Sequence, residues 1–270
     1  MINKQKIGFI GGGNMAEALI KGLETGGVPA ATVLVSEPND QRREWMRDKY
    51  GVAVINDNAE LVRSCSLVVL AIKPQIVKKV LAGLGEAFAG DKLMISILAG
   101  VATATIEELL GGTPRVVRAM PNTPALVDAG AAAICAGQYA RDEDMSQARQ
   151  LFEAVGTVVT VEETQMDAVT GLSGSGPAFV YTFIEALAAG GVQEGLRLDI
   201  AHALAVQTVL GAARLVKESG EHPALLREKV CSPGGTTIAA IRVLEERGLR
   251  ATLMDAVGVA TRRSKELGQG

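Results

Sequence analysis

The sequence predicts an α/β fold in which an N-terminal doubly wound sheet precedes an all-α C-terminal part. Over residues 1–164, apolar runs of strand length alternate with helical stretches, which is the pattern of successive βαβ units. Beyond residue 164 such short runs disappear and long helical stretches remain. We therefore expect two domains, at residues 1–164 and 165–270.

A glycine loop follows the first predicted strand, at residues 6–10. Residues 11–16 match the dinucleotide pattern G-x-G-x-x-G/A and open a helix. Gly11 permits the tight turn, Gly13 lets a pyrophosphate approach the backbone, and Ala16 lets the helix pack closely on the strand. The pattern predicts a Rossmann-type site with the phosphates at the helix N-terminus. The alternative is a purely structural turn.

Composition excludes several classes of protein. The 270 residues carry a net charge of −3 without a basic stripe, which argues against a nucleic-acid partner. No apolar run reaches the roughly 18 residues of a membrane span, and we expect no secretory signal because the sequence leads directly into a strand. Cys65, Cys135 and Cys231 form no C-x-x-C pair, so we expect reduced thiols and a cytoplasmic protein. With only His202 and His222, no metal site is expected.

An acidic residue follows the second predicted strand, at residues 32–36. Glu37 lies ~20 residues beyond the glycine loop, where an acid holds a ribose 2′-hydroxyl. The alternative is a surface glutamate before a turn. Arg42 and Arg43 on the next helix would instead suit a 2′-phosphate, so the choice between NADH and NADPH stays open.

The remaining strands are expected at residues 52–55, 67–72, 93–98, 115–119, 129–136 and 156–161. Lys73 and Pro74 follow one of them, at a carboxyl end where open α/β sheets bind ligands, although Lys73 also fits a solvated helix start. Asn122 lies between two prolines in a stiff loop that presents polar groups.

The second half predicts helices at residues 178–196, 200–216, 236–246 and 251–267. The first of these is apolar on almost every side, so it must be buried. We expect the helices to share a core with a second subunit, and the alternative is a self-contained bundle. His202 lies inside one helix and suits a packed or surface position.

Two loops in this half are rich in small residues and hydroxyls. Residues 172–178 open the long apolar helix, and residues 231–237 open another helix. In the second loop, free N–H groups and hydroxyls at a helix N-terminus predict a carboxylate or phosphate site without a basic residue. A simple N-cap is the alternative for each loop.

These motifs together resemble pyrroline-5-carboxylate reductases along the whole chain. The likeness rests on residues 11–15, 71–75, 120–124, 172–178 and 232–237. It implies hydride transfer from NADPH or NADH to the C=N bond of 1-pyrroline-5-carboxylate, giving L-proline. It also implies a Rossmann domain with a helical dimerisation domain, and homodimers that often assemble into decamers.

The resemblance also supplies roles for single residues. Glu163 matches a carboxylate near the ring nitrogen of the substrate, and Thr170 matches a threonine near the reacting centre. Glu37 departs from relatives that have a non-acidic residue beside a 2′-phosphate. The expected substrate-binding residues are Ser232, Gly235, Thr236 and Thr237. The expected cofactor-binding residues are Gly11, Gly12, Gly13, Asn14, Met15, Glu37, Asn58, Ala71, Ile72, Lys73, Pro74 and Asn122.

Two rival functions remain at this stage. A 3-hydroxyacid dehydrogenase of related layout needs a proton-transferring group, for which Lys217 is the nearest candidate. A non-catalytic dinucleotide sensor would keep the glycine loop but has no use for residues 232–237. Reduction of a protonated imine needs no strong general acid, since the iminium is already an electrophile. This requirement fits a chain without an obvious catalytic histidine.

Overall fold

The computed structural model describes Ile2 and residues 5–268, which form two compact units. The first unit contains the described residues up to Ser175 together with those from Gly258 onward. The second unit is Gly176–Val257. The domain boundary expected after residue 164 stays a prediction. The described residues from Gly258 onward pack with the first unit, which was not predicted.

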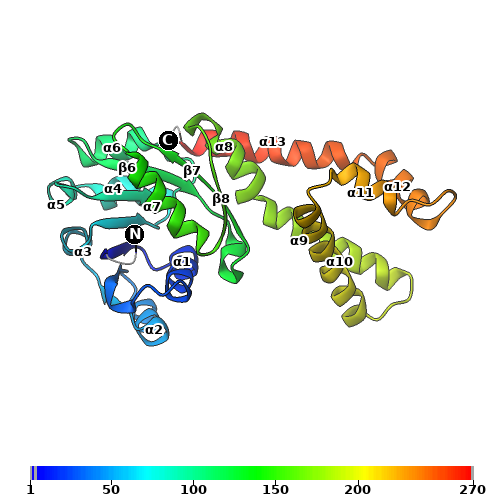
Figure 1. Cartoon of the computed structure of the whole chain (residues 1–270), viewed down its shortest axis with the longest axis horizontal. Helices are drawn as coiled ribbons and strands as arrows, with labels where there is room; N and C mark the ends of the chain where they lie inside the picture. The colour runs from blue at the N-terminus through cyan, green and yellow to red at the C-terminus, as the bar shows by residue number, and fades with distance from the viewer. Residues whose placement is uncertain (1, 3–4, 269–270) are drawn as a thin grey trace. The chain divides into compact units, whose positions relative to one another are not determined.

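The first unit is built on one eight-stranded sheet (Figure 1). Its spatial order is β3-β2-β1-β4-β5-β6-β7-β8, and neighbouring strands are parallel except for β6 and β7, which are antiparallel. The strands are β1 Ile7–Ile10, β2 Val33–Ser36, β3 Ala53–Ile55, β4 Leu67–Leu70, β5 Leu93–Ser96, β6 Arg115–Met120, β7 Gly130–Ala136 and β8 Gly156–Thr160. The order of the first six strands is that of a Rossmann fold, so the predicted fold class is confirmed.

The central strand β4 is apolar throughout because both faces of the sheet are covered. In β4, Leu67 and Val69 lie in one hydrophobic core, and Val68 and Leu70 lie in the other. All four side chains are fully buried. Alternate residues of a strand point to opposite faces, so only an unbroken apolar run can serve both cores.

Helices cover each face of the sheet. Residues of α1 Asn14–Thr25, α2 Asp40–Tyr50 and α7 Asp142–Glu153 enter one core. Residues of α3 Asn58–Ser64, α4 Val77–Leu81, α5 Gly85–Phe88 and α6 Thr103–Leu110 enter the other. The remaining short elements of this unit are η2 Ala30–Thr32, η3 Pro74–Ile76, η4 Thr123–Val127, η5 Glu163–Gln165, α8 Met166–Val169 and η6 Thr170–Gly174.

Two predicted strands end two residues earlier than expected, and one strand has an unexpected direction. The strands predicted at residues 67–72 and 93–98 end at Leu70 and Ser96. Ile72 lies in the turn after β4 and packs against the same core as Val68 and Leu70 of that strand. The apolar run therefore extends beyond the end of the strand and overstates its length. The reversal of β7 relative to β6 was not predicted, because an apolar run carries no information about strand direction.

The second unit is helical, as expected. Its helices are α9 Gly176–Gln193, α10 Leu198–Ser219, α11 Pro223–Lys229, α12 Thr236–Glu246 and the beginning of α13 Leu249–Gly268. The buried apolar residues that α9 and α10 share are Ala188, Ala201 and Ala205, with Ile184 packed against them. A core of three alanines is too small to account for helices of this length.

Large apolar side chains of the second unit are instead exposed on the single chain. They occur on α9, α10, α12 and α13, and a soluble monomer rarely exposes so many together. The exposed residues of α9 and α10 include Val180, Tyr181, Phe183, Leu187, Val192, Leu198, Ile200, Leu204, Val206, Leu210 and Leu215.

Among the described residues, α10 is the one helix long and apolar enough to cross a membrane by length and composition. A single such helix is weak evidence for a span, because core helices of soluble proteins meet the same criterion. Its sequence also contains Asp199, Arg214 and Lys217.

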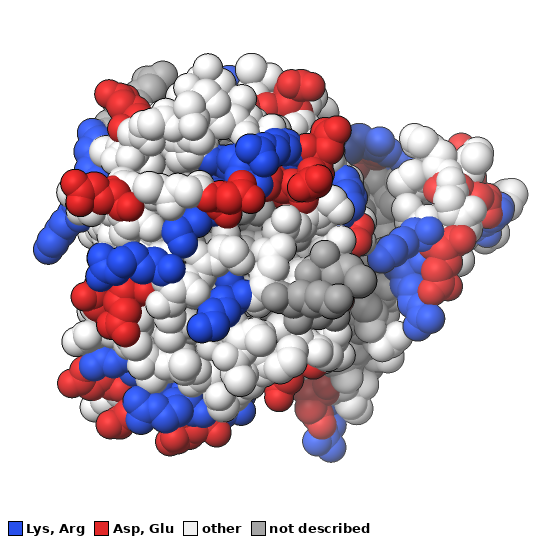
Figure 2. Space-filling model, turned by 60° about the vertical axis from the view of Figure 1, so that its left-hand side comes forward, with Lys and Arg blue, Asp and Glu red and all other residues white. Residues whose placement is uncertain are grey.

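Charges of both signs share the surface of the first unit. Lys and Arg side chains alternate with Asp and Glu over the face drawn in Figure 2. Ion pairs within the first unit include Arg42 with Glu17 and Arg149 with Glu153. This face therefore presents no continuous basic stripe.

Candidate functional site

The glycine loop lies where the strand order of the sheet reverses, between β1 and β4. Doubly wound sheets bind ligands in the crevice outside the carboxyl ends of the strands at this switch point. Gly11 has a φ of +99°, and a Cβ built there would lie 2.4 Å from the backbone oxygen of Ala71. Only glycine lets the turns after β1 and β4 approach so closely.

The peptide groups of Gly12 are held by two charged side chains. Its N–H donates to Glu37 Oε2 at 2.9 Å, and its carbonyl accepts from Arg42 Nε at 2.6 Å. Glu37 Oε1 also accepts from the N–H of Asn39 at 3.0 Å. The structure thus places the carboxylate of Glu37 directly beside the glycine loop.

Gly13 is the N-cap residue of α1, with an extended backbone. A Cβ built at Gly13 meets no heavy atom within 4 Å, so open space adjoins the helix N-terminus. Asn14 begins the helix and is exposed, whereas Met15 packs against the core. The first N–H groups of a helix have no partner within it, and here they adjoin space for a phosphate.

The turn after β4 carries four of the predicted residues. Ala71 and Ile72 are half-buried and pack on opposite cores. Lys73 is exposed as the N-cap residue of η3, and Pro74 occupies the first turn. These residues therefore lie at the switch point, next to Gly11.

Asn58 connects the ends of two elements at the same edge of the sheet. It is the first residue of α3, and its Oδ1 accepts from Ser36 Oγ at 2.7 Å, at the end of β2. Since Ser36 precedes Glu37, this contact helps to hold in place the residue that is predicted to bind the ribose.

Asn122 is buried, and its amide group has partners at both ends. Its Nδ2 donates to the carbonyl of Ser173 at 3.0 Å, and its Oδ1 accepts from the N–H of Ala131 at 2.9 Å. The side chain therefore joins β7 to the turn η6 that contains Thr170.

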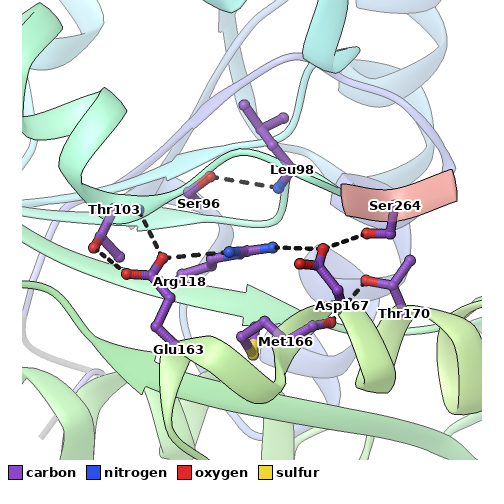
Figure 3. A network of polar contacts seen from close by, with 9 residues as sticks. All are labelled: Ser96, Leu98, Thr103, Arg118, Glu163, Met166, Asp167, Thr170 and Ser264. Carbon is purple, nitrogen blue, oxygen red and sulfur yellow. Dashed lines mark hydrogen bonds and ion pairs between the residues drawn. The ribbon is translucent and has the colours of Figure 1, made fainter. Parts of the chain in front are cut away.

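Glu163 belongs to a network of polar contacts around β6 (Figure 3). Its oxygens accept from the N–H and the hydroxyl of Thr103, at 2.8 and 2.7 Å. Arg118 donates to the same carboxylate at 3.3 Å. Thr103 is the first residue of α6, so Glu163 neutralises the positive end of that helix from a fixed position.

Arg118 was not among the predicted site residues, although it and Arg115 are the two charged residues of an otherwise apolar strand. Its guanidinium lies between Glu163 and Asp167, 4.0 Å from the latter, and Asp167 accepts from Ser264 Oγ at 2.6 Å. Arg118 Nε is a buried nitrogen with no partner among the described residues. The sequence did contain a signal for Arg118, because a charged residue within a strand predicted to be buried usually has a partner.

Thr170 is buried at the start of a π-helical turn. Its hydroxyl donates to the carbonyl of Met166 at 3.0 Å, and its own carbonyl accepts from the N–H of Ser175 at 2.8 Å. Single π-helical turns occur frequently at functional sites. Glu163 begins η5 and Thr170 begins η6, with α8 between these two elements.

The loop at residues 232–237 lies in the second unit. Gly234 has a φ of +69°, and the N–H of Gly235 donates to the carbonyl of Ser232 at 3.0 Å. A Cβ at Gly235 would lie 2.3 Å from Ser232 Oγ. α12 begins at Thr236, and the hydroxyls of Ser232, Thr236 and Thr237 have no partner within the described chain. The hydroxyls and N–H groups of this helix start are available to an anion.

The structure brings the predicted nucleotide residues together at one edge of the sheet. Gly11 approaches Ala71 closely, Gly12 is hydrogen-bonded to Glu37, and Gly13 follows Gly12 in the chain.

The described residues contain no candidate metal-binding cluster, and two of the three cysteines are buried. No cluster of three His, Cys, Asp or Glu side chains with metal-binding geometry occurs within Ile2 and residues 5–268. Burial raises the pKa of Cys65 to about 11 and that of Cys135 to about 12. Both thiols are therefore protonated at neutral pH and poor nucleophiles.

Comparisons with known families account for most of the chain. The family described as pyrroline-5-carboxylate reductase dimerisation matches residues 163–267. The family described as NADP oxidoreductase, coenzyme F420-dependent, matches residues 6–100.

The chain is similar to curated proteins over almost its whole length. It is 49% identical to a pyrroline-5-carboxylate reductase of a Synechocystis species, covering 98% of both chains. It is 47% identical to one of Methanosarcina acetivorans, covering 99% of this chain and 100% of that protein.

Solved structures agree. A pyrroline-5-carboxylate reductase of Coxiella burnetii superposes with a TM-score of 0.92 at 40% identity, covering 97% of this chain and 98% of the other. A pyrroline carboxylate reductase of Plasmodium falciparum with NADP bound gives 0.89 at 32% identity, covering 98% and 99%.

Gly13 and Gly11 provide a matched pair of substitutions. We expect Gly13→Val to fold normally, because its side chain enters open space, but to lose dinucleotide binding, because that space is needed by the phosphates. Gly11→Val should unfold or misfold, since it clashes with the backbone of Ala71. Circular dichroism reports folding and NADH fluorescence titration reports binding. Undiminished NADH affinity in folded Gly13→Val would contradict the assignment.

Proposed function

The chain belongs to the pyrroline-5-carboxylate reductase family, and we propose that it reduces the C=N bond of 1-pyrroline-5-carboxylate to give L-proline. The proposal is carried by the likeness to such reductases along almost the full length of the chain. It places the protein among NAD(P)H-dependent oxidoreductases of amino-acid biosynthesis.

The residues at the switch point fit a nicotinamide dinucleotide. The open space at Gly13 and the free N–H groups of α1 suit the pyrophosphate, and Glu37 suits the ribose hydroxyls. We assign the turn after β4, from Ala71 to Pro74, and the side chains of Asn14, Met15, Asn58 and Asn122 to the surroundings of the same ligand. When bound, the reduced cofactor supplies the hydride for the imine carbon.

The protein's own contribution is binding, orientation and electrostatics. A protonated imine needs no strong acid, so most of the acceleration comes from holding donor and acceptor in reacting geometry. We assign Glu163 and Thr170 to the reacting centre. Support for Glu163 is its fixed carboxylate, since an anion nearby favours the protonated imine. Support for Thr170 is its place in the π-helical turn.

We assign the substrate carboxylate to Ser232, Gly235, Thr236 and Thr237. Support comes from the N-terminus of α12, from the hydroxyls without a partner and from the glycines that expose the backbone. These groups bind an anion without a basic side chain.

The second unit mediates self-association, which the family match to a dimerisation domain supports. We propose a homodimer in which the exposed apolar faces of α9 and α10 become buried against the second copy. Assembly into decamers is the further state that the family resemblance implies. We also propose a cytoplasmic protein, in which α10 packs on protein rather than lipid, because Asp199, Arg214 and Lys217 lie along it.

One set of assays separates this function from its rivals. We expect rapid oxidation of NADH or NADPH with 1-pyrroline-5-carboxylate. In the reverse direction, we expect 3-hydroxyacids to cause no reduction of the oxidised cofactor. Lys217 is exposed in the last turn of α10, which argues against its use as a buried proton-transferring group. Activity only with 3-hydroxyacids would establish the dehydrogenase. Nucleotide binding without turnover of either substrate would support a sensor.

The loop at residues 232–237 gives a test of substrate binding. Thr237→Ala should raise KM for the imine acid about tenfold or more, because losing a hydrogen bond to a charged group costs roughly 1.5–3 kcal/mol. KM for the nicotinamide cofactor should stay nearly constant. Thr25→Ala, at an exposed threonine of α1, serves as the control. Equal damage to both constants would make the loop structural.

The dimer can be tested by placing a charge on its expected interface. Leu204 is 56% exposed on α10 of the single chain. Leu204→Glu should shift the protein from dimer to monomer in sedimentation velocity, because burying an unpaired carboxylate is unfavourable. Val127→Glu, on an exposed residue of the first unit, should leave the dimer intact. A monomeric wild-type protein at micromolar concentration would refute the proposed assembly.

A further inference from the structure

A cluster of charged and aromatic side chains lies where α1 and α2 meet, beside the glycine loop. We call it the corner cluster and define it as Glu17, Arg42, Trp45, Lys49 and Tyr50. Its members come from the first turn of α1 and from α2. None of them belongs to the expected cofactor-binding residues, yet one contacts the glycine loop.

Glu17 is the acceptor at the centre of the corner cluster. It accepts from Arg42 Nη2 at 2.8 Å, from Lys49 Nζ at 3.0 Å and from the Tyr50 hydroxyl at 2.9 Å. Its side chain is only 15% exposed. Burial alone would raise the pKa of Glu17, but these three hydrogen bonds outweigh it, so the pKa is lowered. Glu17 is therefore a fixed anion at neutral pH.

Arg42 is held in one orientation by three contacts. Its guanidinium lies 4.2 Å from the centre of the Trp45 ring and donates to Glu17. Its Nε donates to the carbonyl of Gly12 at 2.6 Å. Stacking and charge-assisted hydrogen bonds both restrict a guanidinium, so the contact with Glu17 turns Arg42 toward the corner cluster.

The carboxylate of Glu37, beside the glycine loop, has no cationic partner among the described residues. The N–H of Gly12 donates to Glu37, and no ion pair joins the Glu37 carboxylate to Lys or Arg among the described residues. Arg43 donates instead to the backbone carbonyl of Glu37 and to Asp40. A nucleotide ribose at this loop would therefore meet an uncompensated carboxylate, while both neighbouring arginines are engaged elsewhere.

We propose that Glu17 is a specificity-determining residue that favours NADH over NADPH by keeping Arg42 engaged away from the 2′ position of the adenosine ribose. The inference rests on the proposed use of a nicotinamide dinucleotide. Glu37 repels a 2′-phosphate, and Glu17 withholds the guanidinium that would otherwise offset this repulsion. Arginine binds phosphate bidentately, so a released Arg42 is a suitable ligand for NADPH.

The test measures the dissociation constants of NADH and NADPH by fluorescence, without substrate. The wild-type protein should bind NADH more tightly. Glu17→Gln should shift the ratio of the two constants about tenfold toward NADPH, which corresponds to about 1.4 kcal/mol. Glu37→Ser should shift it in the same direction. Because no turnover is involved, failure of the reductase assay would leave this test unaffected.

Matched variants separate release of Arg42 from a simple change of charge. Glu24→Gln removes an exposed carboxylate from the same helix and should leave the ratio unchanged. In the double variant Glu17→Gln with Arg42→Met, the shift seen in Glu17→Gln should disappear. A shift that persists in the double variant would attribute the effect to charge alone and overturn the proposal.

Arg42→Met alone covers the case in which Glu17→Gln does not fold. If Arg42 is engaged by Glu17, its loss should change the affinities for both nucleotides by the same factor. A selective loss of NADPH affinity would show that Arg42 already binds the 2′-phosphate, and the proposal would be wrong. Tighter wild-type binding of NADPH than of NADH would overturn it as well.

Discussion

The close approach of two turns at the centre of the sheet underlies the nucleotide site. Gly11 faces the backbone oxygen of Ala71 across a gap that leaves no room for a Cβ. The neighbouring strands β1 and β4 can therefore end side by side, and the N-terminus of α1 starts directly above the switch point. The position of Glu37 and the orientation of Gly12 both depend on this arrangement, since each is defined by contact with the loop.

Much of the first unit could be predicted from the sequence because burial on both faces demands unbroken apolar strands. The runs that became β1, β4 and β5 consist almost entirely of apolar residues, as strands buried on both faces require. The spacing within one βαβ unit directed attention to Glu37, which the structure places beside the glycine loop, and its contact with a ribose stays a prediction. Strand ends were less predictable, as Ile72 shows, since apolar residues of a turn serve the same core.

The network around Arg118 could not be predicted from local pattern. Asp167 and Ser264 are separated by 97 residues, and Thr103 and Glu163 by 60. Their pairing follows from the path of the whole chain, and no periodicity encodes it. The contact between Arg42 and Gly12, which are 30 residues apart, could not be predicted from local pattern either. The sequence alone therefore left the choice between NADH and NADPH open. The polar contacts around the site are thus a tertiary property, whereas its glycines are a local one.

The return of α13 to the first unit has a consequence for biosynthesis. Ser264 contacts Asp167, and Gly268 lies against Gly100, so the first unit includes residues near the end of the chain. During translation the sheet can form early, but its packing partner in α13 is synthesised only after residues 176–257 of the second unit. The growing chain must therefore hold an unfinished surface around Asp167 and Gly100 until Ser264 and Gly268 have been synthesised. Loss of the last dozen residues would leave that surface permanently open.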